Sequence, residues 1–324
     1  MCALLASIFA CCFCCGGAFA ETSSDGETVY LGGFPIGISL DIGGLLVESV
    51  IGVETEYGIA AVEGIMTGDI IKKIDGQEVN SADGMTEILT SSPTEIELVR
   101  DGQNITVTVK PVIEAYSLKP KLGIKIKDTI YGVGTVTYVS KDGRFTALGH
   151  EISSETGAHI PFAGGHVHAC KVVGVKRGSK TEAGALLASL SPEKVYGTVS
   201  CNNSFGIAGA YDCNDCEFYK NGECVKIAKR DEVRPGAAKI RTDVSGSPEY
   251  YDVEIIKATK QSGRKEKGLI LRVTDKRLLD LTGGVVRGMS GSPILQGGKL
   301  VGAVTHVFLN DHTKGYGVYA DCLN

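Results

Sequence analysis

The chain has 324 residues, 43% hydrophobic and 22% charged, which is typical of a soluble protein that buries a core and excludes a disordered chain or a multi-span membrane protein. At roughly 150 residues per domain, this length predicts two domains. The net charge of −5 argues against a large nucleic-acid surface, and the 43 glycines favour short strands joined by tight turns.

Residues 1–20 contain no charged side chain and are long enough to cross a membrane once. They end in Ala18-Phe19-Ala20, which matches the A-x-A pattern cut by signal peptidase. We therefore expect a signal peptide or membrane anchor over residues 1–20, so that the protein is exported and is either anchored or secreted. A polar linker follows over residues 21–29. A buried core helix is the alternative for the first segment.

Short apolar runs broken by Gly, Asp and Asn follow from residue 30 and predict a mainly β protein. Residues 105–109 alternate apolar and polar side chains after an Asp101-Gly102 turn, and Asp75-Gly76 is a second hairpin signal. One helix is expected over residues 81–89, where Ser81 is placed to cap its first turn.

A domain boundary is expected near residue 115, so the first domain covers residues 30–114 and the second covers residues 115–324. The second domain contains further glycine-punctuated strands, including residues 132–139 and 300–308. Helical periodicity is nearly absent there, apart from a short turn after residue 275. Such a length of antiparallel β structure fits a closed barrel or a pair of barrels.

Two motifs of the first domain resemble a PDZ domain: GFPIGI over residues 33–38 and GIMTGDIIKKIDGQEV over residues 64–79. In PDZ domains a glycine loop presents backbone N–H groups to a peptide carboxylate, and the next strand pairs with that peptide. A peptide or C-terminal segment is therefore the implied partner. The resemblance assigns the peptide-binding loop and edge strand to Pro35, Ile36, Gly37 and Ile38. A glycine-rich hairpin without a ligand is the alternative.

The strongest chemical signal is GMSGSP over residues 288–293. A serine between glycines on a tight loop exposes its hydroxyl, and the backbone N–H groups of Gly288 and Ser290 converge where an oxyanion forms in acyl transfer. The loop lacks the G-x-S-x-G pattern of α/β-hydrolases. It is similar to the GDSG[GS]P loop of chymotrypsin-type proteases, with Met289 in place of the Asp. An ordinary turn between two strands is the alternative.

A serine nucleophile needs a general base, and His150 is the preferred one. It ends the sequence TALGH at the close of a short apolar run, as the histidine of barrel proteases does. His306 follows Ser290 on the next predicted strand and is expected to line a specificity pocket. The remaining rivals for the base are His159, His166, His168 and His312.

Asp275 is the preferred acid that orients the base. It precedes Ser290 at the end of a predicted strand, which gives the chain order His, Asp, Ser of chymotrypsin-like enzymes. The residues alone leave four alternatives open, namely Asp231, Asp243, Asp252 and Asp280.

Residues 281–311 and the sequence GYGV over residues 315–318 are similar to the SpoIVB-type sporulation serine endopeptidases, as is TALGHEI over residues 146–152. The resemblance implies a PDZ domain followed by a chymotrypsin-like double β-barrel, in which Ser290 is the nucleophile, His150 the base and Asp275 the third member. Glu151 departs from the family's usual glycine after the histidine.

The same resemblance implies a function. A SpoIVB-type enzyme cleaves a protein partner that regulates an intramembrane protease, and this leads to sigma-factor processing. It works in the intermembrane space of the forespore, attached to a membrane through its N-terminal segment. The resemblance implies neither a cofactor nor a metal, and no nucleic acid.

Two other functions remain open. The first is a non-catalytic scaffold, in which a PDZ domain is joined to a degenerate protease fold. The second is a metal-dependent hydrolase built on His166, His168 and Cys170, which share one face if they lie on a regular strand. Half of a zinc site is suggested by Cys213, Cys216 and Cys224, although disulfides or buried thiols are the preferred interpretation of the cysteines in an exported chain.

Overall fold

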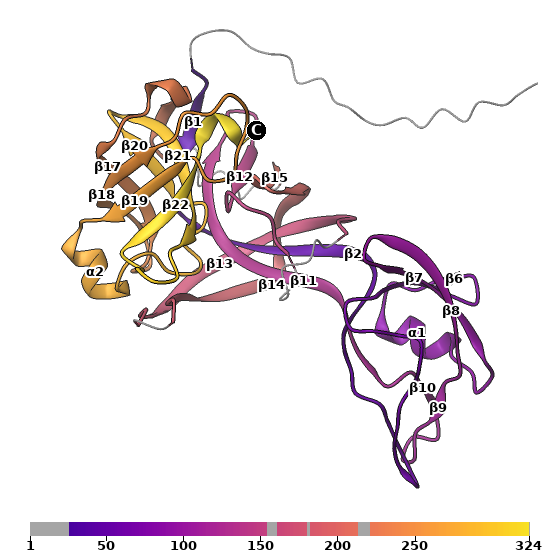
Figure 1. Ribbon diagram of the computed structural model, residues 1–324. Helices are drawn as coiled ribbons and strands as arrows, with labels where there is room; N and C mark the ends of the chain where they lie inside the picture. The colour runs from indigo at the N-terminus through magenta and orange to yellow at the C-terminus, as the bar shows by residue number, and fades with distance from the viewer. Residues whose placement is uncertain (1–25, 154–160, 180–181, 213–220, 324) are drawn as a thin grey trace, which may run out of the picture.

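The computed structural model describes residues 26–153, 161–179, 182–212 and 221–323. Over these ranges the chain is mainly β-sheet, and its α-helices α1 (Ala82–Ile88) and α2 (Lys276–Thr282) are short. Figure 1 shows a larger and a smaller lobe connected by two long strands, β2 (Pro35–Val50) and β11 (Ile124–Val139). The mainly β fold is confirmed. The expected anchor over residues 1–20 lies outside the described residues.

The smaller lobe consists of short strands around one helix. Asp75 and Asp101 have positive φ angles of 47° and 50° and are each followed by a glycine with positive φ, as two-residue hairpin turns require. Ser81 caps α1, because its hydroxyl accepts a hydrogen bond from the Gly84 N–H at 3.1 Å. The strands are β3 (Val53–Thr55), β4 (Gly58–Ala60), β5 (Ile70–Ile74), β6 (Gln77–Glu78), β7 (Thr94–Arg100), β8 (Gln103–Val109), β9 (Val112–Ile113) and β10 (Pro120–Lys121).

Strands β2 and β11 pair antiparallel along almost their whole length and belong to both lobes. Leu45 of β2 is buried in the core of the smaller lobe, whereas Ile36 and Ile38 are buried in the larger lobe. The smaller lobe is therefore inserted between two strands of the larger one. The expected domain boundary at residue 30 does not coincide with this pairing, because residues 28–41 pair with strands of the larger lobe.

Six strands of the described chain close the first barrel of the larger lobe. They pair in the cyclic order β2, β11, β12, β15, β14, β13 and back to β2. Its interior is an apolar cluster that includes Ile38, Val136 and Phe145. The strands new to this barrel are β12 (Arg144–Ala147), β13 (Gly164–Lys176), β14 (Ala185–Asn203) and β15 (Gly206–Tyr211).

The second barrel closes in the same way, in the cyclic order β17, β18, β19, β22, β21, β20 and back to β17. Its core contains Leu271, Met289 and Ile294, all fully buried. This confirms the double β-barrel. The strands are β17 (Gly236–Asp243), β18 (Pro248–Ala258), β19 (Leu269–Val273), β20 (Pro293–Gln296), β21 (Lys299–Val307) and β22 (Lys314–Tyr319).

Two short strands join the barrels. β1 (Thr28–Leu31) pairs with β11 of the first barrel and with β16 (Cys224–Ile227), and β16 pairs with β21 of the second barrel. Single 3-10 turns occur at Arg230–Glu232 and Ala320–Cys322. The two barrels therefore form one continuous sheet, with the nucleophile loop at their junction. None of the helices in the described ranges has the length and apolar character needed to span a membrane.

Candidate active site

The loop that carries Ser290 connects α2 to β20 at the junction of the barrels. Its hydroxyl is half-buried and donates a hydrogen bond to the carbonyl oxygen of Thr305 on β21, at 2.7 Å. The loop is anchored beneath the serine, because the Gly291 N–H donates to the Val304 carbonyl at 2.7 Å and the Ser292 N–H donates to the Met289 carbonyl at 2.9 Å.

Two threonines of β11 hold this loop against the first barrel. The N–H of Thr135 donates to the Ser290 carbonyl and its hydroxyl donates to the Gly288 carbonyl, each at 2.9 Å. The hydroxyl of Thr137 donates to the Gly291 carbonyl at 2.8 Å. Three hydrogen bonds from β11 therefore hold the carbonyl groups of this loop in place.

The N–H groups of Gly288 and Ser290 donate to no acceptor in the described part of the chain. They are therefore available to a negatively charged oxygen, the role that the sequence predicts for them. Gly288 and Gly291 both have φ of +94°, a conformation that residues with a Cβ rarely adopt. A Cβ at Gly291 would also lie 1.9 Å from the carbonyl oxygen of Thr135, so the loop requires glycine there.

His150 follows β12 through a sharp turn. Leu148 and Gly149 have φ angles of +67° and +69°, and a positive φ at a leucine is a strained conformation of the kind concentrated at functional sites. The Nδ1 atom of His150 lies 2.8 Å from the carbonyl oxygen of Glu151. Burial lowers the pKa of His150, and it outweighs the opposite effect of Glu151.

Two neighbouring residues of strand β21 contact Ser290 and His150. Thr305 accepts the Ser290 hydroxyl, and the ring centroid of the next residue, His306, lies 4.7 Å from that of His150. Burial, His150 and Lys267 together lower the pKa of His306 to about 4, so this ring is neutral at pH 7. No hydrogen bond joins Ser290 to His150 among the described residues.

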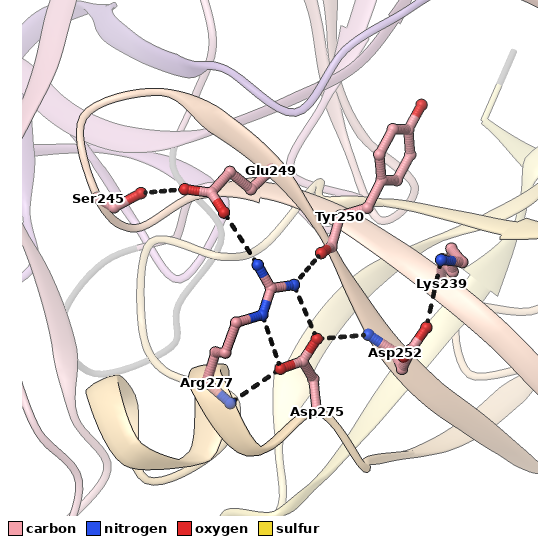
Figure 2. Close-up of polar contacts among 7 residues, drawn as sticks. All are labelled: Lys239, Ser245, Glu249, Tyr250, Asp252, Asp275 and Arg277. Carbon is pink, nitrogen blue, oxygen red and sulfur yellow. Dashed lines mark hydrogen bonds and ion pairs between the residues drawn. The ribbon is translucent and has the colours of Figure 1, made fainter.

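Asp275 lies at the N-terminus of α2 and contacts Arg277 (Figure 2). Its carboxylate accepts hydrogen bonds from the Arg277 N–H at 2.8 Å, from the Arg277 side chain at 3.0 Å, and from the Asp252 N–H at 3.3 Å. Burial raises the pKa of Asp275, but these donors outweigh it and hold the pKa below its ordinary value.

Asp275 shares no hydrogen bond with any histidine of the described chain, so its expected place in a triad rests on the family resemblance alone. None of the four alternative aspartates shares a hydrogen bond with a histidine in the described ranges either. Asp252, for example, pairs with Lys239 at 3.4 Å (Figure 2).

The predicted peptide-binding segment, Pro35 to Ile38, lies at the start of β2 inside the first barrel. Gly37 and Ile38 pair with β11 on one side and with β13 on the other, and Ile36 and Ile38 are buried. This segment therefore offers no free strand edge to a peptide, which corrects the assignment made from its resemblance to a glycine loop. The presence of a PDZ domain stays a prediction.

The histidines proposed as metal ligands lie on β13, but register shifts on both sides of His168 interrupt its regular alternation. His168 is buried and its Nε2 lies 2.7 Å from the Ser39 hydroxyl, whereas His166 is exposed. In the ranges that the structure describes, no three His, Cys, Asp or Glu side chains are placed to hold a metal ion. Cys170 is a free thiol, and Cys213, Cys216 and His159 lie outside those ranges.

Four residues of the site were missed in the sequence. They are Thr135, Thr137, Thr305 and Asn202, whose side-chain amide holds the backbone beyond His150. The alternating threonines of the sequence GTVTYV are the one signal that pointed to a polar strand face, and nothing in the sequence indicated that this face meets the nucleophile loop.

Solved protease structures match parts of this chain. The active form of the Rv3671c protease of Mycobacterium tuberculosis matches with a TM-score of 0.35 and 15% identity, over 59% of this chain and 70% of that one. The HtrA-type protease AlgW with a tripeptide matches with a TM-score of 0.35 and 12% identity, over 60% of this chain and 54% of that one. For the MamO protease domain of Magnetospirillum magneticum the TM-score is 0.29 and the identity 12%, over 58% of this chain and 84% of that one.

No curated protein matches this chain. The family model described as SpoIVB peptidase S55 matches residues 118–323, which include the nucleophile loop, His150 and every strand of the two barrels except β2. The chain therefore belongs to the SpoIVB peptidase S55 family and is a serine endopeptidase.

Proposed function

We propose that this protein is the exported signalling protease of a sporulation cascade. Its substrate is a protein that regulates an intramembrane protease, and cleavage of that substrate leads to sigma-factor processing. The family to which the chain belongs supports the role in sporulation. The uncharged, apolar residues 1–20 and the Ala18-Phe19-Ala20 sequence support export and membrane attachment.

In the proposed mechanism the Ser290 oxygen attacks the peptide carbonyl carbon and its proton passes to Nε2 of His150. The oxyanion of the tetrahedral intermediate accepts hydrogen bonds from the N–H groups of Gly288 and Ser290. His150 then donates the proton to the leaving amine, which leaves an acyl-enzyme at Ser290. Water, deprotonated by His150, hydrolyses the ester and restores the serine.

The Ser290 hydroxyl must leave the Thr305 carbonyl before it can transfer its proton. It does so by rotation about its Cα–Cβ bond, a change between staggered side-chain conformers. His306 is adjacent to both Thr305 and His150, so we place it in the substrate-binding region as a specificity residue. Its low pKa keeps a second positive charge away from His150 at neutral pH.

One observation supports the catalytic part of the proposal: the N–H groups of Gly288 and Ser290 are unpaired in the described chain, in a loop that Thr135 anchors. The Ser290 hydroxyl is hydrogen-bonded to Thr305, and the next residue, His306, contacts His150. A scaffold without catalysis has no need for this arrangement.

A fluorophosphonate probe tests whether Ser290 is a catalytic nucleophile, because the probe forms a covalent bond with an activated serine only. Wild-type protein should be labelled at Ser290, whereas Ser290→Ala and His150→Ala should remain unlabelled with unchanged circular dichroism spectra. Equal labelling of all three proteins would refute the assignment.

The non-catalytic scaffold is the second candidate, and the absence of a Ser290–His150 hydrogen bond in the described chain favours it. The same labelling experiment separates the two functions. A scaffold stays unlabelled at Ser290 even when the partner protein is added, whereas an enzyme whose serine rotates on substrate binding is labelled.

For the peptide partner we propose a different edge from the one that the sequence indicated. Residues 124–126 of β11 pair with no strand other than β2 within the described chain, and α1 lies next to β11. The preceding Leu122-Gly123 has the apolar-glycine character of a carboxylate-binding loop, and Gly123 has φ of +62°. Addition of an extended peptide to this edge would follow the β-augmentation mode. A peptide with a free carboxyl terminus should shift the amide NMR signals of residues 122–127, and its amidated form should bind less tightly.

A further inference from the structure

The hydrogen bond at Nδ1 fixes which nitrogen of His150 carries the proton. A carbonyl oxygen only accepts hydrogen bonds, so the 2.8 Å contact with Glu151 requires that Nδ1 donates. In the neutral ring the lone pair is then on Nε2, the form that a general base needs. In serine proteases with a triad, an aspartate imposes this tautomer.

The carbonyl of Glu151 is held in place from the next residue. The Asn202 side chain makes two hydrogen bonds to the backbone of Ile152: its Oδ1 accepts from the N–H at 2.9 Å, and its Nδ2 donates to the carbonyl at 3.0 Å. Asn202 is 8% exposed and belongs to β14. A paired amide of this kind fixes the position of one peptide unit on each side of Ile152, including the Glu151 carbonyl.

A second contact fixes the same residue through its side chain. A Cβ at Gly132 of β11 would lie 3.0 Å from Cδ1 of Ile152, so Ile152 lies directly on the backbone of β11. Ile152 packs against the core of the first barrel. The segment that follows His150 is therefore attached to two different strands of that barrel.

Asp275, the predicted acid of the triad, makes its hydrogen bonds to groups other than a histidine in the described chain. In the described chain, all the donors to the Asp275 carboxylate come from Arg277 and from the Asp252 backbone (Figure 2). The Arg277 side chain also donates hydrogen bonds to Glu249 at 3.2 Å and to the Tyr250 carbonyl at 2.8 Å. This network stabilises the N-terminus of α2 and the turn into the second barrel. It directs the carboxylate toward a cation and backbone donors instead of an imidazole.

We propose that the carbonyl of Glu151, held by Asn202, orients the general base His150 in place of an aspartate. Asn202 is then a positioning residue, because it acts through the backbone and not on the substrate. The inference rests on the proposed role of His150 as the base. The full chain would work as a Ser–His dyad with a backbone acceptor.

The direct test is 15N NMR of the full chain with labelled histidine. Wild-type protein should show His150 protonated at Nδ1 and unprotonated at Nε2 at pH 8. Asn202→Ala should replace this signal with a mixture of tautomers. It should also slow fluorophosphonate labelling of Ser290 by about a hundredfold, the loss that a misplacement of about 1 Å causes. Asn202→Asp, which keeps the acceptor for the Ile152 N–H, should recover part of the rate.

Asn203→Ala is the matched control, because it removes the same side chain one residue further on, at an exposed turn where Asn203 caps Phe205. It should label at the wild-type rate. Asp275→Asn should keep the Nδ1–H signal of His150. Loss of that signal in Asp275→Asn, or wild-type tautomer and labelling rate in Asn202→Ala, would overturn the inference. If Asn202→Ala does not fold, the wild-type and Asp275→Asn spectra still decide it.

These outcomes separate the inference from the proposed function. A wild-type protein that shows the Nδ1–H tautomer but is never labelled at Ser290 contradicts the enzyme and leaves the orientation of His150 intact. A protein labelled at Ser290, in which Asn202→Ala changes nothing, contradicts only the inference.

Discussion

The hydroxyl of Ser290 donates to the carbonyl oxygen of Thr305 at 2.7 Å, and it is thereby held away from the imidazole of its expected base. A hydrogen bond of this kind contributes about 1 kcal/mol net, which is small enough for substrate binding to reverse. We therefore interpret the arrangement as the resting conformer of the nucleophile. Rotation about the Cα–Cβ bond of Ser290 is the change that we expect to release its hydroxyl from Thr305.

The pH dependence of labelling is expected to follow His150. Its pKa lies below the ordinary 6.5 because burial disfavours the charged ring, so the neutral base persists into mildly acidic solution. The rate of fluorophosphonate labelling should therefore be constant from pH 8 to 7 and should fall with a midpoint below 6.5. Glu151 and His306 are the titratable neighbours of the ring. Because the pKa of His306 is about 4, His306 gains its proton only at a lower pH than His150 does. A midpoint above 6.5 would contradict the assignment of His150 as a buried neutral base.

Asp275 should contribute mainly to stability. Asp275→Ala removes the cap of α2 and the ion pair with Arg277, and it should lower the free energy of unfolding by about 2 kcal/mol. Asp275→Asn keeps a capping oxygen and should cost about half as much, with labelling of Ser290 within about tenfold of wild type. A loss near the ten-thousandfold that a triad aspartate contributes would restore Asp275 to the catalytic set. Unfolding is best followed by circular dichroism, because the chain has no tryptophan.

The sign of the pH effect on Asp275 is fixed by its lowered pKa. The ionised carboxylate stabilises the folded state, so its contribution is complete above the unfolded pKa of about 3.9. It is lost as the pH falls through the lower folded value. The stability difference between wild type and Asp275→Asn should be measured by urea unfolding at pH 7 and at a series of lower pH values. It should be constant above about pH 5 and should shrink as the pH falls below about 3.9. A difference that does not change with pH over this range would mean that the ion pair is not its source.

Much of the fold could be predicted because its signals are local. The Asp75 and Asp101 turns, the Ser81 cap and the period-two strand at residues 105–109 depend on neighbours in sequence, and the structure has all of them. The insertion of the smaller lobe could not be predicted from local patterns, because β2 and β11 are continuous strands that change lobes without a break. Their pairing is set by contacts between residues far apart in the chain.

In the candidate site, too, the residues with local sequence signals could be predicted and those defined by long-range contacts could not. Ser290 and His150 stand out by their flanking glycines and apolar runs, which are visible in the sequence. Nothing near Thr135 or Asn202 in the sequence indicates which group each one contacts, since their backbone partners lie 153 and 50 residues away. Asp275 shows how one local signal can have two meanings: an aspartate at the end of a strand fits the chain order of a triad and also fits the pattern of a helix cap.

Thr135 is expected to matter for catalysis through the loop. Thr135→Val keeps the shape of the side chain but leaves the Gly288 carbonyl without its hydroxyl donor, and a lost hydrogen bond of this kind costs about 1 to 3 kcal/mol. Labelling of Ser290 should slow by about tenfold, because the loop that carries the oxyanion donors is less well fixed. Thr137→Val is the comparison, as it removes the bond to Gly291 at the far side of the serine. An unchanged labelling rate in Thr135→Val would show that the backbone bond from Thr135 to Ser290 is sufficient.

Gly291 should tolerate no side chain, and Gly297 should tolerate one at much lower cost. Both have positive φ, +94° and +58° respectively, but a Cβ at Gly291 would lie 1.9 Å from the Thr135 carbonyl oxygen, whereas a Cβ at Gly297 meets nothing within 4 Å. Gly291→Ala should therefore lower the free energy of unfolding by on the order of 3 kcal/mol and abolish labelling of Ser290. Gly297→Ala, in the turn between β20 and β21, should cost about 1 kcal/mol from backbone strain alone and keep wild-type labelling. Thermal melts of the two variants give the comparison, and equal losses would mean that backbone conformation alone, without the contact to Thr135, explains why glycine stands beside the nucleophile.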